Sequence, residues 1–296
     1  MSKLEGRYQK IFYVLGAILV LNWLVALAKV IYGWMSHSGS MFADGIHSFA
    51  DGASNIIGMV GISVASQPPD EHHPYGHKKY ETFAALAIAA LLIVISVFLV
   101  KDAFQMFYQP HTPEVTGISF AVMLITMAVN WAVMVYEKNK GRELQSDVLV
   151  CDALHTQSDI LTSVSVLVSL IAVKLGFPMM DAITTLFIAG FIGWAAFGIV
   201  KESSDVLCDR VVVDESQIRD LVLSVPKIRA CHEIRTRGRR DDVHVDLHIL
   251  VANEMPIAEA HDLASHIEEI IKKHIEGVTD VIVHIEPESH EHGDKK

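Results

Sequence analysis

Two segments that lie far apart in the chain repeat one pattern of ionisable residues. The pattern is DxxHxxxD, and it occurs at residues 44–51 and again, 108 positions later, at residues 152–159. In a helix, positions i, i+3 and i+7 lie on one face, so each segment presents an Asp-His-Asp stripe. Carboxylates and imidazoles are common metal ligands, and two matching stripes therefore predict a shared metal site.

The inner members of the two stripes form a complete donor set if the stripes face each other. They supply two imidazole nitrogens and two carboxylate oxygens, from His47, Asp51, His155 and Asp159. This set suits Zn²⁺ better than Ca²⁺ or Mg²⁺, which prefer oxygen ligands alone. The same groups take up protons when the metal leaves, so metal and H⁺ compete for one site. Such competition favours a proton-coupled transport cycle.

A structural reading of the stripes is the alternative. In that reading, the histidine and aspartates of each helix satisfy one another in a polar network without a metal. The repetition at identical spacing argues against it. For Asp44 and Asp152 two roles stay open, either outer-shell or entry carboxylates of the metal site or structural hydrogen bonding.

The elements that carry the stripes are predicted to lie in a membrane. The chain has 296 residues, 51% of them hydrophobic, a mean hydropathy of +0.34 and a net charge of -11. A spanning helix needs roughly 20 apolar residues, and six such windows lie within residues 1–205. Four have no charged residue, and two carry the stripes. The windows are 11–28, 38–66, 82–100, 115–135, 148–173 and 182–200. The negative net charge also excludes a typical nucleic-acid-binding protein.

The basic residues of the short loops predict the orientation. Eight Lys and Arg residues fall on one side of the six windows, whereas Lys29, Lys101 and Lys174 are expected at helix ends on the other side. By the positive-inside rule, both termini are cytoplasmic. The first window also resembles a signal peptide, but the apolar run is long and continues past Lys29, which favours a retained anchor.

The rest of the chain has the pattern of a soluble domain. Residues 214–224 and 256–274 have helical spacing, and residues 230–237, 243–251 and 278–285 read as strands. This α-β-β-α-β order predicts a cytoplasmic α+β domain over residues 206–290, followed by a polar tail at 291–296. Because its core is small, association with a second copy is expected. The three cysteines, Cys151, Cys208 and Cys231, form no CxxC pair and are expected to be reduced structural thiols.

A polar loop between the second and third windows completes a set of motifs with a known counterpart. The loop contains Asp70 and the segment His73-Pro-Tyr-Gly-His77. Together with six windows, the paired stripes and a metallochaperone-like domain, it makes the chain resemble the cation diffusion facilitator (CDF) family. Within that family it is similar to a bacterial zinc efflux transporter. The resemblance implies a homodimer in the bacterial inner membrane that exports divalent metal in exchange for protons by alternating access.

The resemblance also assigns residues to sites. It implies a transport site at His47, Asp51, His155 and Asp159, where the histidine at 47 replaces an aspartate of close relatives and favours zinc over iron or cadmium. It implies a loop site at Asp70, His73 and His77, with His72 pointing elsewhere, and an ion pair between Lys79 and Asp209 that hinges the two domains. In the cytoplasmic domain, it implies zinc ligands shared across a dimer, at His232, His248, His261, His284 and Glu286, with His244 as a surface histidine.

Other functions remain open at this stage. A carrier for Fe²⁺, Co²⁺, Cd²⁺ or Mn²⁺ would use the same site, and so would a non-transporting metal sensor or scaffold, although the intact ligand set argues against the latter. A membrane-embedded metallohydrolase could use the site to activate water. The chain has no HExxH motif and no further nucleophile motif, so we expect no enzyme activity. The expected partners are therefore Zn²⁺, H⁺, lipid and a second copy.

Overall fold

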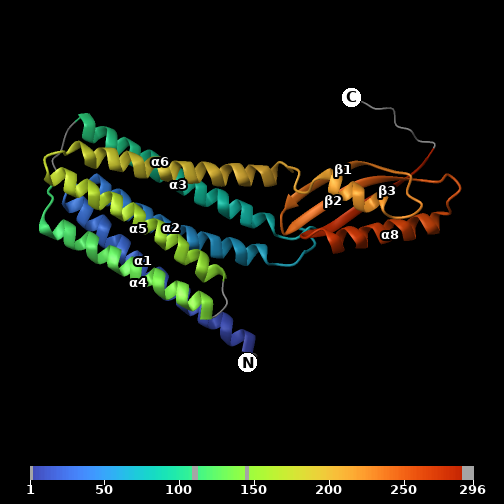
Figure 1. Ribbon diagram of the computed structural model, residues 1–296, viewed down its shortest axis with the longest axis horizontal. Helices are drawn as coiled ribbons and strands as arrows, with labels where there is room; N and C mark the ends of the chain where they lie inside the picture. Colours follow the sequence, from blue (N-terminus) through green and yellow to red (C-terminus); the bar gives the residue numbers. More distant parts are fainter. Residues whose placement is uncertain (1–2, 109–112, 144–146, 289–296) are drawn as a thin grey trace. The chain divides into compact units, whose positions relative to one another are not determined.

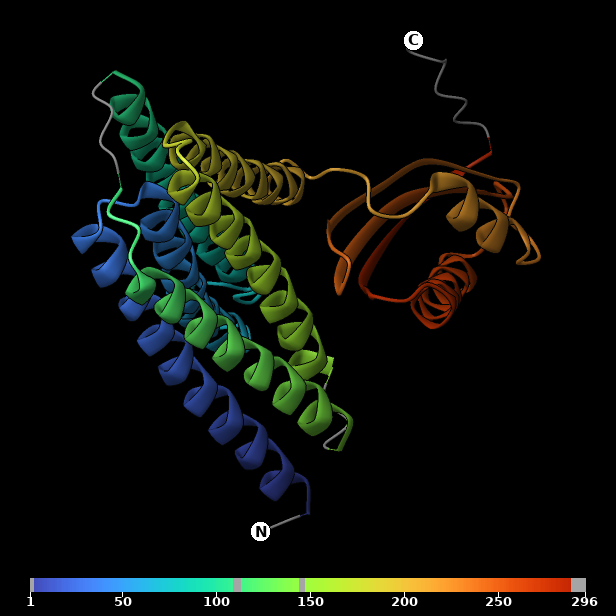
Figure 2. The ribbon, with the colours of Figure 1, turned by 60° about the vertical axis from the view of Figure 1, so that its left-hand side comes forward.

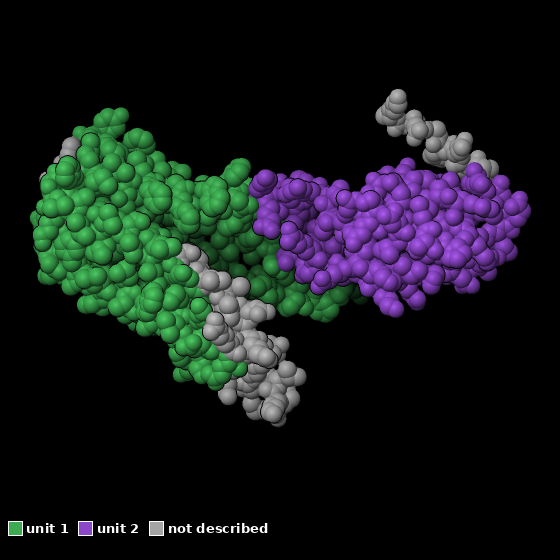
Figure 3. Space-filling model, in the orientation of Figure 1, with its two compact units in different colours: residues 1–200 green, residues 201–296 purple. Residues whose placement is uncertain are grey.

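The computed structural model describes residues 3–108, 113–143 and 147–288. Within these ranges, the side chains of 3–12, 141–142, 147–152, 154–155 and 158 are not described. The predicted polar tail, 291–296, lies outside the described residues. The chain forms two compact units, residues 1–200 and 201–296, coloured separately in Figure 3. Each unit is described here by itself.

Six long helices build the described part of the first unit (Figure 1). They are α1 (Lys3–Met35), α2 (Gly39–Ala65), α3 (Lys79–Tyr108), α4 (Gly117–Glu143), α5 (Asp147–Lys174) and α6 (Met179–Leu207). Apolar residues from α2 to α6 form the buried core, which includes Ala43, Leu99, Met123, Leu170 and Ile192. Large apolar side chains also cover the outside, with Trp194 73% exposed. An apolar outer surface is typical of a protein solvated by lipid.

Among the described helices, four are long and apolar enough to cross a membrane. They lie at Tyr13–Met35, Lys79–Tyr108, Gly117–Lys140 and Met179–Leu207. Of the two helices that carry the Asp-His-Asp stripes, α2 is described throughout and does not pass this test of length and composition. The test does not apply to the full length of α5, because many side chains in its first half are not described. The polar stripe lowers the hydropathy of a helix, even where the helix is packed among apolar neighbours. The prediction of six spans is therefore supported for four helices, and the six-span count stays a prediction.

The expectation of a helix end is wrong for Lys101, which lies within α3, and for Lys29, which lies within α1. Lys29 was placed at a helix end, on the side with few basic residues, whereas α1 continues to Met35 and the Lys29 side chain is 0% exposed. Helices α1 and α2 approach closely beside Lys29, because a Cβ atom added at Gly45 of α2 would lie 2.7 Å from the backbone nitrogen of Val30 in α1. The lysine is therefore enclosed inside the bundle and is not a loop residue.

The second unit has the predicted α-β-β-α-β order: α7 (Glu215–Leu223), β1 (Ala230–Arg239), β2 (Asp242–Val251), α8 (Ile257–His274) and β3 (Val278–Pro287). The sheet order is β1-β2-β3, with β1 antiparallel and β3 parallel to the central strand. Both helices lie on one face of this mixed sheet (Figure 2). Alternate residues of β2, such as Leu247 and Ile249, are buried in the core beneath Ile218 and Ile267 of the helices. The opposite face is left for the histidines of the strands.

Candidate metal centres

The first candidate centre lies between α2 and α5. His47 and Asp51 project from one face of α2, and Asp159 from α5, and all three are buried or nearly so. The Nδ1 atom of His47 is 3.8 Å from Oδ2 of Asp51, and its Nε2 atom is 3.9 Å from Oδ1 of Asp159. Three possible ligand atoms, one from each residue, lie within 4.8 Å of one another. Two zinc ligands in a tetrahedral shell are about 3.3 Å apart, so a small inward movement would suit an ion.

The hydrogen bonding of His47 also fits an ion. Its Nδ1 atom is buried and has no hydrogen-bond partner among the described residues. Buried polar atoms are almost always paired, because an unpaired one loses its contact with water without compensation. The edge of the imidazole meets the Phe191 ring of α6, with centroids 6.2 Å apart and planes at 89°, and this contact limits the ring's rotation. The Nδ1 atom of His47 is thus available to bind a metal ion.

Three further residues were predicted at or near this centre, two on α5 and one on α2. His155 and Asp152 fall among the residues whose side chains are not described. Their assignments therefore stay predictions. Asp44, on α2, is described, and its carboxylate Oδ2 is 2.9 Å from Nζ of Lys29. Of the two roles left open for Asp44, this geometry supports the structural one.

The second candidate centre is the loop between α2 and α3. Asp70 Oδ1 lies 3.1 Å from Nδ1 of His73, and Asp70 Oδ2 lies 3.4 Å from Nε2 of His77. The backbone amide of His73 donates to Asp70 at 2.6 Å, and this bond, despite some opposing desolvation, is the main reason that the pKa of Asp70 lies below its usual value. His72 contributes its backbone amide to Asp70, and its side chain is exposed. The loop therefore gathers the three predicted ligands.

The neighbours of His77 fix the orientation of its ring. Its Nδ1 atom lies 3.2 Å from the carbonyl oxygen of Pro68, and a carbonyl oxygen only accepts hydrogen bonds. Nδ1 is thus the donor, and Nε2 is the ring nitrogen that faces Asp70. The preceding Gly76 has φ +83°, a conformation that glycine adopts without strain, and the turn it makes allows His77 to reach back. This arrangement is typical of a histidine prepared to bind a metal.

The third candidate centre lies on the open face of the sheet. His232, His248 and His284 face one another across β1, β2 and β3, because they are paired in register. Glu286 joins them: its carboxylate is 2.9 Å from Nδ1 of His248, 3.4 Å from Nε2 of His232 and 3.5 Å from Nε2 of His284. His261 lies exposed on α8 and, within the described residues, is not part of this cluster.

Glu286 is the electrostatic centre of this third cluster. Burial by itself would raise the pKa of Glu286, but the hydrogen bond with His248 and the charges of the three nearby histidines together lower it. Its Oε2 atom is buried and has no hydrogen-bond partner among the described residues. An ionised carboxylate with an unused lone pair beside imidazoles has the donor chemistry of a zinc site. The residues present therefore fit the regulatory metal that the resemblance implies.

Some residues near these centres were not identified from the sequence. A bulge in β1 between His232 and Arg235 gives Glu233 a positive φ of 49° and brings its carboxylate to 3.8 Å from Nε2 of His248. A bulge leaves no reliable signal in a single sequence. His244, predicted as a surface histidine, is partly buried and lies 3.5 Å from Asp280.

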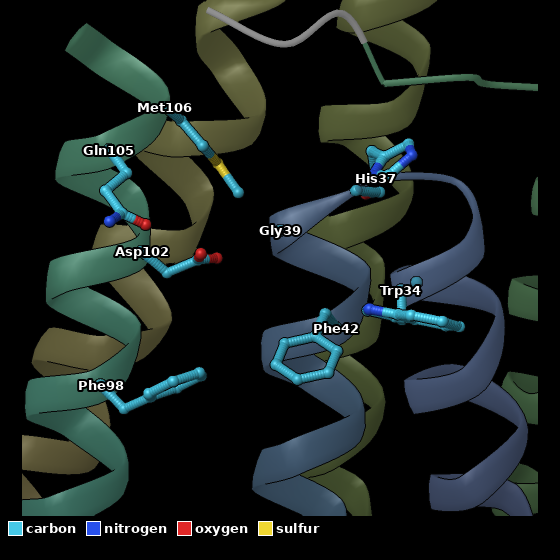
Figure 4. Close-up of a pocket in the computed structure, with 10 residues that line it drawn as sticks. Trp34, His37, Gly39, Phe42, Phe98, Asp102, Gln105 and Met106 are labelled. Carbon is cyan, nitrogen blue, oxygen red and sulfur yellow. The ribbon is translucent and has the colours of Figure 1, made fainter. Parts of the chain in front are cut away.

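Two further features lie outside the three centres. Lys79 begins α3 in the first unit and Asp209 belongs to the second unit, so their predicted ion pair stays a prediction. A pocket of about 330 Å³ opens between α3 and the connection of α1 and α2 (Figure 4). Its lining is partly aromatic and partly polar, and the Asp102 carboxylate is directed into it. None of the candidate metal ligands lines this pocket. It is therefore distinct from the metal centres.

Comparison with known proteins identifies the family. The cation efflux transmembrane domain matches residues 15–208, and the cytoplasmic domain of cation efflux proteins matches residues 212–288. An uncharacterised transporter of Methanocaldococcus jannaschii is 34% identical, over 90% of this chain and 94% of the relative. The cation-efflux pump FieF of Klebsiella pneumoniae is 30% identical over 89% of this chain and 88% of the relative, and that of Serratia proteamaculans is 29% identical over 89% and 88%. This chain is an integral membrane protein of the cation diffusion facilitator family of cation-efflux transporters.

Proposed function

We propose that the protein exports Zn²⁺ from the cytoplasm in exchange for H⁺, as a homodimer that works by alternating access. The observation that carries the proposal is the trio of His47, Asp51 and Asp159, buried between two helices at ligand spacing. Membership of the family establishes cation efflux. The ligand types of this trio support the proposed choice of metal and the proposed coupling to protons. His155 is the proposed fourth ligand.

The donor types favour zinc within the family. Imidazole nitrogen suits Zn²⁺, whereas Mn²⁺ favours oxygen ligands. His47 offers a buried nitrogen at a position where an aspartate would make the site harder. Fe²⁺, Co²⁺ and Cd²⁺ are the alternative cargoes, and a metal-sensing scaffold that does not transport is the alternative role. Direct uptake measurements separate all of these.

Proton exchange follows from the ligands themselves. Carboxylates and imidazoles bind a metal only after losing their protons, so each cycle that releases the metal can load protons at the same atoms. The buried position of the trio means that empty, fully charged carboxylates would be unfavourable. Protonation of the empty site therefore lowers the energy of the metal-free state in which the carrier returns. We propose that both termini are cytoplasmic, in accordance with the basic loops, and that the membrane is the bacterial inner membrane.

The second unit is proposed to regulate the dimer. The family of cytoplasmic domains that matches residues 212–288 is named for dimerisation. The cluster around Glu286 lies on the open face of the sheet in this domain. Metal bound there by one conformation of a dimer would stabilise that conformation by mass action. His261 is proposed to join the cluster from the partner subunit, and the Lys79–Asp209 pair to form the hinge.

Transport by purified protein in proteoliposomes tests the proposal. A zinc dye inside the vesicles and a pH dye report both fluxes, with and without an imposed pH gradient. We expect Asp51→Ala and His155→Ala to lower zinc-driven proton flux by at least a hundredfold, since each loses a ligand. Asn55→Ala, an exposed position one turn further along α2, is the matched control and is expected to keep the wild-type rate. Unchanged flux in Asp51→Ala would refute the assignment.

A further inference from the structure

A buried network of three residues joins α1, α2 and α5 beside the proposed transport site. The Nζ atom of Lys29 is 2.9 Å from Oδ2 of Asp44 and donates to the hydroxyl of Ser163 at 2.9 Å. That hydroxyl in turn donates to Asp44, at 3.0 Å to Oδ2 and 3.3 Å to Oδ1. All three residues are 0% exposed. The three polar groups thus pair with one another within an apolar bundle.

The network lies one helical turn from the transport site. Asp44 comes three residues before His47 on α2, and Ser163 comes four residues after Asp159 on α5. Residues with these spacings share a helix face on adjacent turns, about 5.4 Å apart along the axis. The contact of Asp44 with Ser163 and the approach of His47 to Asp159 are therefore neighbouring cross-links between the same two helices.

The network resists separation of these helices. The Lys29–Asp44 ion pair holds α1 against α2, and the hydrogen bonds of Ser163 join α5 to that pair, so moving α5 away would leave two buried charges with fewer hydrogen bonds, which is costly in hydrocarbon. Lys29 also belongs to a helix whose backbone lies against α2, since a Cβ atom added at Gly33 of α1 would lie 2.5 Å from the backbone nitrogen of Phe42. Ser163 thus ties α5 to a tightly packed pair of helices.

The network also decides which carboxylates are available to a metal. Both oxygens of Asp44 are engaged, Oδ2 by Lys29 and Ser163 and Oδ1 by Ser163. Although Asp44 lies on the same stripe as His47 and Asp51, its charge is already neutralised. Asp44 is consequently not available as a metal ligand.

We propose that Lys29, Asp44 and Ser163 position the transport site, by fixing the spacing between α2 and α5 at which His47 and Asp159 can share one ion. This inference rests on the proposed function. Lys29 and Ser163 are positioning residues and do not touch the metal. Loss of the cross-link lets the ligands of the two helices move apart, and metal affinity falls although every ligand is present.

Zinc titration of the full-length protein in detergent tests this proposal. The background carries alanine at His73, His77, His248 and His284, so that the transport site is the zinc site measured. In this background Ser163→Ala is expected to weaken zinc binding at least tenfold. Ser169→Ala is the matched control on the same helix, because Ser169 is also 0% exposed and its hydroxyl has no hydrogen-bond partner among the described residues. We expect this control to bind within twofold of the background protein.

Two further variants separate positioning from folding. Ser163→Thr keeps the hydroxyl and is expected to recover most of the affinity. Lys29→Met combined with Asp44→Asn removes both charges together, and is expected to fold and yet to bind zinc as weakly as Ser163→Ala. Equal affinities of Ser163→Ala and Ser169→Ala, or full affinity of the double variant, would overturn the proposal. If the background protein binds zinc no better than Asp51→Ala, the proposed transport site itself fails.

Discussion

Nε2 of His47 and Oδ1 of Asp159 lie 3.9 Å apart, although the two residues belong to different helices and are separated by 112 positions in the chain. Neither helix offers enough ligands by itself to enclose an ion among the described residues. A metal ion bound as proposed would therefore hold α2 and α5 together, and its release would weaken that connection. The proposed alternating access would use such a link between cargo and helix spacing.

The first prediction concerns selectivity at this site. His47→Asp replaces a nitrogen ligand by an oxygen ligand, which makes the site harder. We expect the preference for Zn²⁺ over Fe²⁺ to fall about tenfold. Uptake of each metal into proteoliposomes at equal concentration measures it. An unchanged ratio would remove His47 as the determinant of zinc selectivity.

Most of the architecture was predictable, because its signals are local. Apolar windows located the long helices, and alternation located the three strands of the second unit. The stripe of His47 and Asp51 was found because helical spacing alone places both on one face. The approach of Asp159 followed from the repeat. The number of spans stays a prediction, because the polar stripe of α2 lowers the hydropathy by which spans are recognised and α5 is only partly described.

The errors and omissions have one physical origin, which is long-range pairing. Lys29 was expected at a helix end because a lone lysine in an apolar segment usually lies near water. Its partner, Asp44, is close in space only after α1 and α2 fold against each other. The continuation of the apolar run beyond Lys29 was the available signal. Glu233 was missed for a similar reason, since the bulge that redirects it depends on pairing with β2.

The second prediction concerns the loop centre. Asp70 contacts both loop histidines and is held as an anion by backbone amides. Asp70→Asn removes the charge and one ligand, so we expect zinc to bind the loop at least tenfold more weakly. Zinc titration of a protein lacking the ligands of the other two centres measures this. His72→Ala is the control, because only the backbone of His72 contacts Asp70; equal losses in both variants would contradict the loop site.

The third prediction concerns the cluster around Glu286. His248→Ala removes a ligand that contacts Glu286 at 2.9 Å, so the rise in melting temperature produced by zinc should be largely lost. His266→Ala, an exposed histidine on α8, should keep it. The lowered pKa of Glu286 means that this carboxylate favours the folded state above its unfolded pKa and ceases to do so as the pH falls through the folded value. Equal zinc shifts in both variants would contradict this site.

The fourth prediction concerns the stability of the bundle. Asp181 of α6 is 1% exposed and accepts hydrogen bonds from the Ser38 hydroxyl and from the amides of Gly39 and Ser40, at the start of α2. Asp181→Asn loses the charge that favours these bonds at a helix N-terminus, which should cost about 2 to 4 kcal/mol. Thermal unfolding in detergent measures the loss. Glu202→Gln, exposed on the same helix, should change the melting temperature little. A similar stability of the two variants would contradict the stabilising role of the Asp181 hydrogen bonds.

The fifth prediction concerns the reactivity of Cys231 in the second unit. Burial raises the pKa of the Cys231 thiol to about 11, from 9.0 for an isolated thiol, so its thiolate fraction falls about a hundredfold at pH 8. In a Cys151→Ser background, a maleimide should therefore label the exposed Cys208 at least a hundred times faster than Cys231. Because the folded pKa is the higher one, Cys231 favours folding below pH 9, and this contribution falls by about 2 to 3 kcal/mol as the pH rises towards 11. Cys231→Ala should lose this part of the alkaline destabilisation, and equal labelling rates of the two thiols would show that Cys231 is not enclosed in the core.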